Sequence, residues 1–377
     1  MDLGLSEEQE MLKTSARDFL QKECPKQLVR QLDDSEEGHS PDLWRKMAEQ
    51  GWMGLVFPEE YGGSGGSFLD LAVLLDEMGY NILPGPFFSA VILGGLPIAL
   101  TGSEEQKMEF LPRLADGTTL LTLALTEPTA GYDAASVRTE ATARNGEYVI
   151  NGTKLFVPNA NVADYLICVA RTGKGDQAES SLTLLIIDAR SPGVRITPLK
   201  TIARDRQCEV VFDNVVVSEK NILGRPNEAW PIVEEVLQKA TVAKCAEMVG
   251  GAQAVLDMTV NYARERIQFD RPIGSFQAIQ HYCADMASDV IGSRFLTYKA
   301  AWKTSEGLPA AADVAMAKAW TGEAYERVTL LGHQILGAIG FTMDHDMHLY
   351  YRRAKAGQTI FGDADFQRGI VARGQGL

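Results

Sequence analysis

Apolar residues recur at intervals of three and four along the first third of the chain, which is the spacing of one buried helix face. Leu71, Leu74 and Met78 follow this spacing. Residues 61–66 and 83–86 interrupt it with glycine and proline, which are poorly tolerated inside helices. The pattern therefore predicts a helical segment divided by loops.

The middle third of the chain has a different pattern of short β-branched or apolar runs, which predicts strands. These runs cover residues 120–125, 148–150, 154–157, 165–170, 182–187 and 209–217. Asn151 and Gly152 lie between two of the runs, and this pair favours a two-residue type I′ hairpin turn. Many short strands separated by turns predict a small β-barrel or sandwich.

Helical spacing returns after Gly224, and its length predicts a helical bundle. We expect helices from about 228 to 266, 276 to 307 and 311 to 336, with a last one near Phe366. The predicted fold class is α+β, mainly α. Its predicted domains are an N-terminal helical domain (1–117), a middle β domain (118–224) and a C-terminal helical bundle (225–377).

Charge and composition exclude some classes of function. The 377 residues include 36 Lys and Arg against 50 Asp and Glu, a formal net charge of −14, which excludes a generally basic nucleic-acid-binding protein. The N-terminus is acidic where a secretory signal is basic, and no apolar run reaches the roughly 20 residues that a membrane span needs. Five irregularly spaced cysteines indicate reduced, mostly buried thiols. We therefore expect a cytoplasmic protein without a membrane span.

His345 and His348 are three residues apart and would share one face of a helix. A metal site needs further ligands, and the sequence shows no ligand cluster near this pair. We interpret both as polar or capping residues and expect no metal site.

Five groups of residues, taken in order, resemble the acyl-CoA dehydrogenase family over nearly the whole chain. They are PEEYGG (58–63) with LDEMG (75–79); LTEP (125–128) with GYD (131–133); NGTK (151–154); RERIQF (264–269) with RPI (271–273) and FQ (276–277); and GAIGFT (337–342).

The resemblance implies the family's fold: an N-terminal helical domain, a β domain and a C-terminal four-helix bundle that forms the oligomer core. It also implies FAD as cofactor, an acyl-CoA as substrate and electron-transferring flavoprotein as electron acceptor. The assembly would be a homo-oligomer or a heterotetramer with a related chain, in which a neighbouring subunit binds the ADP half of FAD.

One group of residues matches the family's contacts with the flavin ring: Leu125, Thr126, Phe156, Val157 and Pro158. Phe156 offers a flat apolar surface beside the ring. Pro158 stands where the family usually has a hydroxyl that bonds flavin N5, and proline has neither a side-chain donor nor an N–H. From the residues alone, a strand that ends in a proline turn and a Phe in the β-domain core are the alternatives.

A second group matches the family's contacts with the FAD of a neighbouring subunit: Arg266, Gln268, Phe269, Gln277, Gln334, Gly337 and Ala338. Arginine suits a pyrophosphate by its charge and forked geometry, although surface ion pairs are the alternative. Ala338 and Asp270 both replace family glycines. Tyr132 replaces a family serine that contacts CoA, so we expect Tyr132 at the substrate.

The catalytic base is the residue in which the chain departs most from the family. Many members have a Glu in a C-terminal loop, where this chain has Phe361; another branch has it on the first long bundle helix, near Ala240. Glu247 lies two turns beyond Ala240 and so on the same helix face.

We predict Glu247 as the base, with Gly250 and Gly251 leaving room for the substrate, and the backbone N–H of Phe361 stabilising the enolate oxygen. Asp363 and the neighbouring Asp365 are alternative bases. The open alternatives for Glu247 are a surface pair with Lys244 or a contact in tight helix packing.

The predicted reaction is α,β-dehydrogenation of an acyl-CoA thioester to the trans-2-enoyl-CoA, with a hydride passing to flavin N5. Two other functions stay open. One is a partner subunit with an incomplete active site in a heteromeric dehydrogenase, and the other is a flavin monooxygenase or oxidase, because a fold does not fix its chemistry.

Overall fold

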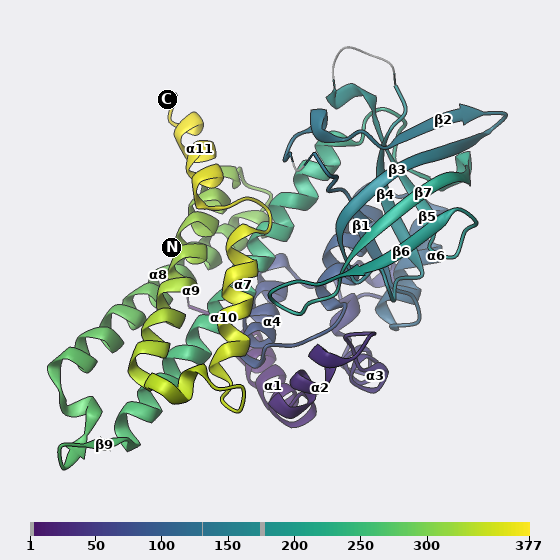
Figure 1. The fold of residues 1–377 in the computed structure, drawn as a ribbon. Helices are drawn as coiled ribbons and strands as arrows, with labels where there is room; N and C mark the ends of the chain where they lie inside the picture. The colour runs from purple at the N-terminus through teal and green to yellow at the C-terminus, as the bar shows by residue number, and fades with distance from the viewer. Residues whose placement is uncertain (1–3, 130, 174–177) are drawn as a thin grey trace. The chain divides into compact units, whose positions relative to one another are not determined.

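The computed structural model describes residues 4–129, 131–173 and 178–377 (Figure 1). The chain forms two compact units, each built from distant segments. The first comprises Met1–Gln31, Ser67–Leu83 and Thr241–Leu377, and the second comprises Leu32–Gly66 and Pro84–Ala240. The three consecutive domains expected from the sequence stay a prediction.

The first unit is helical. The long helices predicted from the sequence are confirmed, and α10 had not been predicted. Its elements are α1 (Glu7–Glu23), most of α2 (Lys26–Asp34), α4 (Phe68–Asn81), most of α7 (Trp230–Glu265), β9 (Ile267–Gln268), β10 (Arg271–Pro272), α8 (Gln277–Ser305), α9 (Ala311–Leu336), α10 (Met347–Thr359) and α11 (Ala364–Gly374). Helix α9 packs against α8, α10 and α11, and α1 packs against α4.

The second unit contains the β domain. Its strands are β1 (Leu121–Ala124), β2 (Glu140–Arg144), β3 (Glu147–Pro158), β4 (Tyr165–Arg171), β5 (Leu182–Asp188), β6 (Val194–Leu199), β7 (Gln207–Ser218) and β8 (Ile222–Leu223). They follow the order β6-β7-β3-β2-β4-β5-β8, and β1 pairs with β4. Side chains from both halves of this sheet share one hydrophobic core, including Ile150 and Phe212 from one half and Cys168 and Leu185 from the other. This shared core agrees with the predicted barrel or sandwich.

Four helices of the second unit precede its strands in the chain. They are α3 (Pro41–Glu49), the π-helix η3 (Phe88–Gly95), α5 (Leu96–Thr101) and α6 (Glu104–Ala115). Gly94 in η3 lies directly on β1, because an added Cβ would be 2.5 Å from the Cβ of Leu121.

The predicted hairpin turn at Asn151–Gly152 is wrong, because β3 continues through both residues. The turn lies at Asn145 and Gly146, which have φ values of 54° and 81° and join β2 to β3. Gly152 instead marks a register shift in β3, where an added Cβ would be 2.5 Å from Thr139 Oγ1. Asn-Gly therefore has two uses here: positive φ in a turn, and close approach of a neighbouring strand.

A buried ion pair joins β3 to the segment after β1. Lys154 Nζ lies 2.7 Å from Glu127 Oε1, and both side chains are almost fully buried. Lys154 also donates to the Leu125 carbonyl at 3.1 Å, and the backbone N–H groups of Arg138 and Thr139 donate to Glu127. Burial opposes ionisation of Glu127, but Lys154 and these hydrogen bonds hold the pKa of its carboxyl below the ordinary value.

Helices α4 and α7 approach so closely that glycine is needed on both. A Cβ on Gly79 of α4 would lie 1.9 Å from the carbonyl oxygen of Glu247, and a Cβ on Gly250 of α7 would lie 1.7 Å from that of Asp76. The two contacts are reciprocal, with a glycine of each helix against the backbone of the other. This packing fixes the backbone of α7 at Glu247.

We predict that Glu127→Gln lowers the free energy of unfolding by about 3–5 kcal/mol at pH 7, because Lys154 is left buried without its counter-charge. The folded-state pKa of Glu127 is below its unfolded value, so the pair stabilises the protein above the unfolded pKa and loses this effect as pH falls through the folded pKa. Urea unfolding of wild type and variant at pH 7 and at acidic pH would measure this. The double variant E127M/K154M should recover most of the loss, and an equal loss at both pH values would contradict the account.

We also predict that Gly250→Ala destabilises the protein by about 1–3 kcal/mol or more, because its Cβ forces α4 and α7 apart. Gly369→Ala in α11 is the control, since the nearest atom to its added Cβ is Arg373 Nη1 at 3.6 Å. The control should be neutral or more stable by up to about 1 kcal/mol, from helix propensity. Thermal unfolding would compare them, and a G250A variant as stable as wild type would refute the close packing.

Candidate functional site

The predicted flavin-ring residues of the second unit lie on neighbouring backbone segments. Leu125 and Thr126 follow β1 and are half-buried, and Thr126 accepts a hydrogen bond from the Leu155 N–H at 2.8 Å. Lys154 holds the Leu125 carbonyl. Both carbonyl groups are therefore fixed by β3, and Phe156 follows directly after that contact.

A β-bulge turns Phe156 out of the sheet. The register of β3 against β7 shifts between Lys154 and Val157, and Phe156 has a φ of 52°. This left-handed conformation is rare for an aromatic residue and leaves its side chain 56% exposed, while Val157 is buried. An exposed aromatic face beside a strand end fits a flat ring such as isoalloxazine. The alternative of Phe156 as a core residue of the β domain is wrong.

Pro158 is the last residue of β3, and its carbonyl accepts a hydrogen bond from the buried Thr122 hydroxyl at 2.7 Å. This contact uses an acceptor of Pro158 and supplies no donor to replace the missing hydroxyl. Tyr132 is 52% exposed in a loop that Asp133 stabilises by accepting a hydrogen bond from the Ser136 N–H at 2.9 Å.

Glu247 in the first unit forms an ion pair with Lys244, three residues earlier on α7. The Glu247 side chain is 26% exposed and that of Lys244 is 18% exposed. Burial raises the pKa of Tyr325, and the charge of Glu247 adds to this shift, so the carboxylate and the phenol are electrostatically coupled. Both alternatives for Glu247, the pair with Lys244 and tight helix packing, are features of the structure, and the catalytic role stays a prediction.

The free space expected beside Gly250 and Gly251 is taken up by other groups, which corrects that expectation. Helix α4 lies against Gly250, and an added Cβ on Gly251 would be 2.3 Å from Tyr325 Oη. Both glycines thus serve close helix packing, and their contact with substrate stays a prediction.

Phe361 lies in a tight turn between α10 and α11. Its φ is 59° and that of Gly362 is 91°. The carbonyl of Phe361 accepts a hydrogen bond from Gln367 Nε2 at 2.7 Å, and the carbonyl of Gly362 accepts one from Lys318 Nζ at 3.0 Å. A non-glycine residue in this conformation needs such support from its surroundings.

Asp363, the alternative base, caps α11, because its side chain accepts a hydrogen bond from the Phe366 N–H at 2.9 Å. The neighbouring Asp365 is exposed and pairs with Arg368 at 2.9 Å. The first of these carboxylates has a structural partner at the helix start, which is a common use of aspartate.

The residues predicted to meet a neighbouring subunit's FAD are mostly exposed. Arg266, Gln268, Phe269 and Gln277 lie in or next to the β9–β10 hairpin, whose turn residues Phe269 and Asp270 both have positive φ. Phe269 is 86% exposed. Gln334 and Ala338 are exposed at the end of α9 and Gly337 is partly exposed. In the first unit, the residues at the hairpin and those at the end of α9 are thus accessible.

The histidines contact backbone groups. His345 Nδ1 accepts a hydrogen bond from the Met347 N–H at 3.2 Å, and His348 Nε2 lies 3.1 Å from the Met343 carbonyl. Among the described residues, no group of three or more His, Cys, Asp or Glu could hold a metal ion. Every cysteine is a free thiol, and all but Cys283 are buried, which confirms the expected burial.

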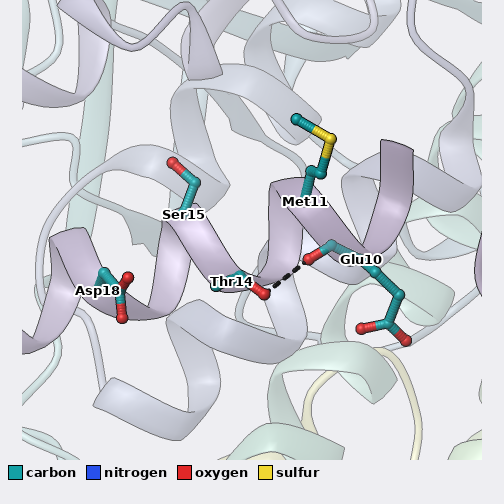
Figure 2. A pocket seen from close by; sticks show the side chains of 5 residues that line it. All are labelled: Glu10, Met11, Thr14, Ser15 and Asp18. Carbon is teal, nitrogen blue, oxygen red and sulfur yellow. Dashed lines mark hydrogen bonds between the residues drawn. The ribbon is translucent and has the colours of Figure 1, made fainter. Parts of the chain in front are cut away.

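A surface hollow on α1 is lined by Glu10, Met11, Thr14, Ser15 and Asp18 (Figure 2). All five belong to one helix, and none is a predicted site residue. This hollow therefore does not compete with the groups above as a candidate site.

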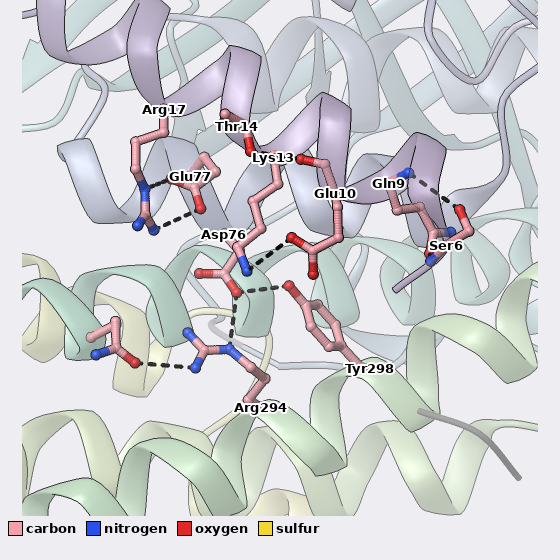
Figure 3. Close-up of polar contacts among 11 residues, drawn as sticks. Ser6, Gln9, Glu10, Lys13, Thr14, Arg17, Asp76, Glu77, Arg294 and Tyr298 are labelled. Carbon is pink, nitrogen blue, oxygen red and sulfur yellow. Dashed lines mark hydrogen bonds and ion pairs between the residues drawn. The ribbon is translucent and has the colours of Figure 1, made fainter. Parts of the chain in front are cut away.

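A network of charged side chains ties α4 to its neighbours in the first unit (Figure 3). Asp76 accepts hydrogen bonds from the Tyr298 hydroxyl at 2.8 Å and from Arg294 Nε at 3.4 Å. Arg17 donates two bonds to Glu77, at 2.7 and 2.8 Å. Burial raises the pKa of Glu77, although Arg17 opposes the shift. These contacts hold α1, α4 and α8 together.

Sequence reasoning missed Lys318 and Gln367, which support the turn at Phe361, and the pair of Glu127 and Lys154. One signal was available for Lys318. It is the one charged residue in the stretch of apolar, small and uncharged residues from Val314 to Gly322 of α9. Such a position predicts a buried ammonium group with specific partners.

Comparisons with known proteins agree with this architecture. Three family models match in chain order: "Acyl-CoA dehydrogenase, N-terminal domain" at residues 6–118, the middle domain at 122–215 and the C-terminal domain at 227–376. A relative from Bacillus subtilis, "Probable acyl-CoA dehydrogenase YngJ", is 36% identical and covers 99% of each chain.

Two solved structures extend the likeness. Butyryl-CoA dehydrogenase from Megasphaera elsdenii has a TM-score of 0.93 at 30% identity, covering 100% of both chains. A chain of the ChsE4-ChsE5 complex from Mycobacterium tuberculosis has a TM-score of 0.91 at 29% identity, covering 100% of this chain and 99% of the other.

Members of the matched family are FAD flavoproteins and oxidoreductases acting on CH–CH groups, as the resemblance implied. No helix in the described part of the chain is long and apolar enough to cross a membrane. With all three family models matched in order, and a relative at 36% identity over nearly the full length, the chain belongs to the acyl-CoA dehydrogenase family.

Proposed function

We propose that the protein is an FAD-dependent dehydrogenase that converts an acyl-CoA thioester to its trans-2-enoyl-CoA. The observation that carries this proposal is the match of all three family models in chain order. FAD, when bound, supplies the acceptor for the hydride that leaves Cβ. The residues of the chain itself bind the thioester and remove its α-proton.

Glu247 is the proposed base. The two positions where family members carry this carboxylate hold Phe361 and Ala240 instead, and Glu247 lies on the same helix as Ala240. Its carboxylate, which pairs with Lys244, is the group that would accept the α-proton.

The N–H of Phe361 is the proposed donor to the thioester oxygen, where negative charge develops as the α-proton is removed. A backbone N–H does not depend on the side chain, so a Phe in place of the family's Glu preserves this donor. Asp363 is the weaker candidate for the base, because its carboxylate already accepts the Phe366 N–H at the start of α11.

Contacts with FAD are proposed for two sets of residues. Phe156 would pack on the ring, next to Leu125, Thr126, Val157 and Pro158. The second set would bind the FAD of a neighbouring subunit, and its members are Arg266, Gln268, Phe269, Gln277, Gln334, Gly337 and Ala338. Tyr132 would contact the CoA part of the substrate. An oligomer is therefore part of the proposal, with electron-transferring flavoprotein as acceptor and the cytoplasm as location.

A second candidate is a subunit of a heteromeric dehydrogenase, whose related chain completes the site. Pro158 favours it, because this residue offers no donor where the family usually has a hydroxyl. The similar ChsE4-ChsE5 structure is a complex of two chains. Expression alone tests the choice: a yellow, active homo-oligomer excludes the heteromer, whereas inactive protein rescued by a related chain supports it. Rapid oxidation of the reduced protein by air would instead favour an oxidase or monooxygenase.

We predict that Glu247→Gln lowers kcat for acyl-CoA oxidation by about 10²–10⁴-fold while the protein keeps bound FAD, because the α-proton loses its acceptor. Reduction of an artificial electron-accepting dye measures turnover, and the visible spectrum measures the flavin. Glu235→Gln is the matched control, since Glu235 also lies on α7 and pairs with a lysine, Lys239, at 3.3 Å. Normal turnover in E247Q with FAD bound would refute the assignment.

A further inference from the structure

A single buried lysine holds the turn that contains Phe361. Lys318 lies on α9 and is 1% exposed, and its Nζ donates to the carbonyls of Gln358 and Gly362, both at 3.0 Å. One acceptor belongs to the last turn of α10 and the other follows Phe361 directly. The ammonium group thus bonds to the chain on both sides of residue 361. We call these two hydrogen bonds, from Lys318 to Gln358 and Gly362, the Lys318 clamp.

The clamp acts on a backbone that is strained by its conformation. Phe361 and Gly362 both have positive φ, at 59° and 91°, and a β-carbon at residue 361 makes this conformation unfavourable. Gln367, which is buried, adds a bond to the Phe361 carbonyl at 2.7 Å. The turn that carries the N–H of residue 361 is therefore held by side chains on α9 and α11.

The charge of Lys318 is influenced by Lys244, the ion-pair partner of the proposed base. Burial is the main cause that lowers the pKa of its ammonium group, and Lys244, the partner of Glu247, lowers it further. Asp363 and Cys245 oppose this shift. Lys318 is thus electrostatically coupled both to the lysine that pairs with Glu247 and to the acid that follows the turn.

We propose that Lys318 is a positioning residue for the reaction: it fixes the turn so that the N–H of Phe361 meets the thioester oxygen. This inference rests on the proposed function and adds to it a residue that touches neither substrate nor cofactor. The competing interpretation is a purely structural lysine that joins α9 to α10. The two interpretations predict different regions of faster hydrogen–deuterium exchange when these hydrogen bonds are removed, and different changes in kcat.

The test compares Lys318→Met with Lys355→Met. Methionine keeps the length and apolar body of the side chain but donates no hydrogen bond. Lys355 is a control in the same bundle, because its ammonium group pairs with Glu326 on α9 and not with a carbonyl of the turn. Hydrogen–deuterium exchange should show amides of residues 359–363 exchanging at least about tenfold faster in K318M, with other bundle helices and K355M unchanged.

Kinetics of the FAD-loaded proteins provide the second measurement. Misalignment of an oxyanion donor should lower kcat of K318M by about 10²-fold, with KM changed by less than about threefold. Unchanged exchange at 359–363, exchange that rises throughout the bundle, or faster local exchange with normal kcat would each overturn the role of Lys318. If K318M does not fold, Lys318→Gln, which keeps an N–H donor, is measured in the same way and should show smaller changes of the same kind.

Different results would overturn the proposed function and the role of Lys318. A wild-type protein that binds FAD but oxidises no acyl-CoA, alone or with a related chain, would overturn the proposed function and with it the catalytic purpose of the clamp. Activity in the wild type together with an unaltered turn in K318M would overturn Lys318 alone.

Discussion

The backbone contact between α4 and α7 is the constraint on which the placement of Glu247 depends. Gly79 meets the carbonyl of Glu247 and Gly250 meets that of Asp76, so neither helix can rotate or slide without a clash. Asp76, flanked by these contacts, also accepts hydrogen bonds from Tyr298 and Arg294 on α8 (Figure 3). A carboxylate on such a fixed backbone loses little entropy when it meets a substrate, which is the advantage of placing catalytic groups on rigid elements.

The rest of the proposed chemistry depends on a second fixed element, the turn at Phe361. In many family members one residue of this loop supplies both a carboxylate and an N–H, whereas the proposed mechanism assigns these two functions to separate residues of this chain. The carboxylate is on α7, and the N–H remains on a turn that Lys318 and Gln367 hold. The charge of Lys244, the ion-pair partner of Glu247, adds to the lowering of the pKa of Lys318 that burial causes.

Sequence periodicity predicts the long helices and most of the strands, but it predicts neither α10 nor the contacts between elements. The long helices α7, α8 and α9 follow from apolar spacing sustained over long stretches, and α7 is buried on nearly every face between Ala240 and Val255. The Asn-Gly rule was correct in principle but was applied to Asn151–Gly152, where a strand passes close to Thr139, and the turn is at Asn145–Gly146. Local sequence does not distinguish a glycine that turns from a glycine that allows close approach. For the same reason Gly250 and Gly251 suggested space for a ligand, although α4 and Tyr325 lie there, and the partners of Lys318 lie 40 and 44 residues away.

Anaerobic mixing of the FAD-loaded protein with straight-chain, branched and steroid-side-chain acyl-CoA thioesters, without any electron acceptor, tests the central claim most directly. The account predicts that at least one thioester bleaches the oxidised flavin absorbance in a single turnover and yields one equivalent of trans-2-enoyl-CoA per flavin. An oxidised spectrum that persists with every thioester, in protein shown to contain FAD, would contradict it.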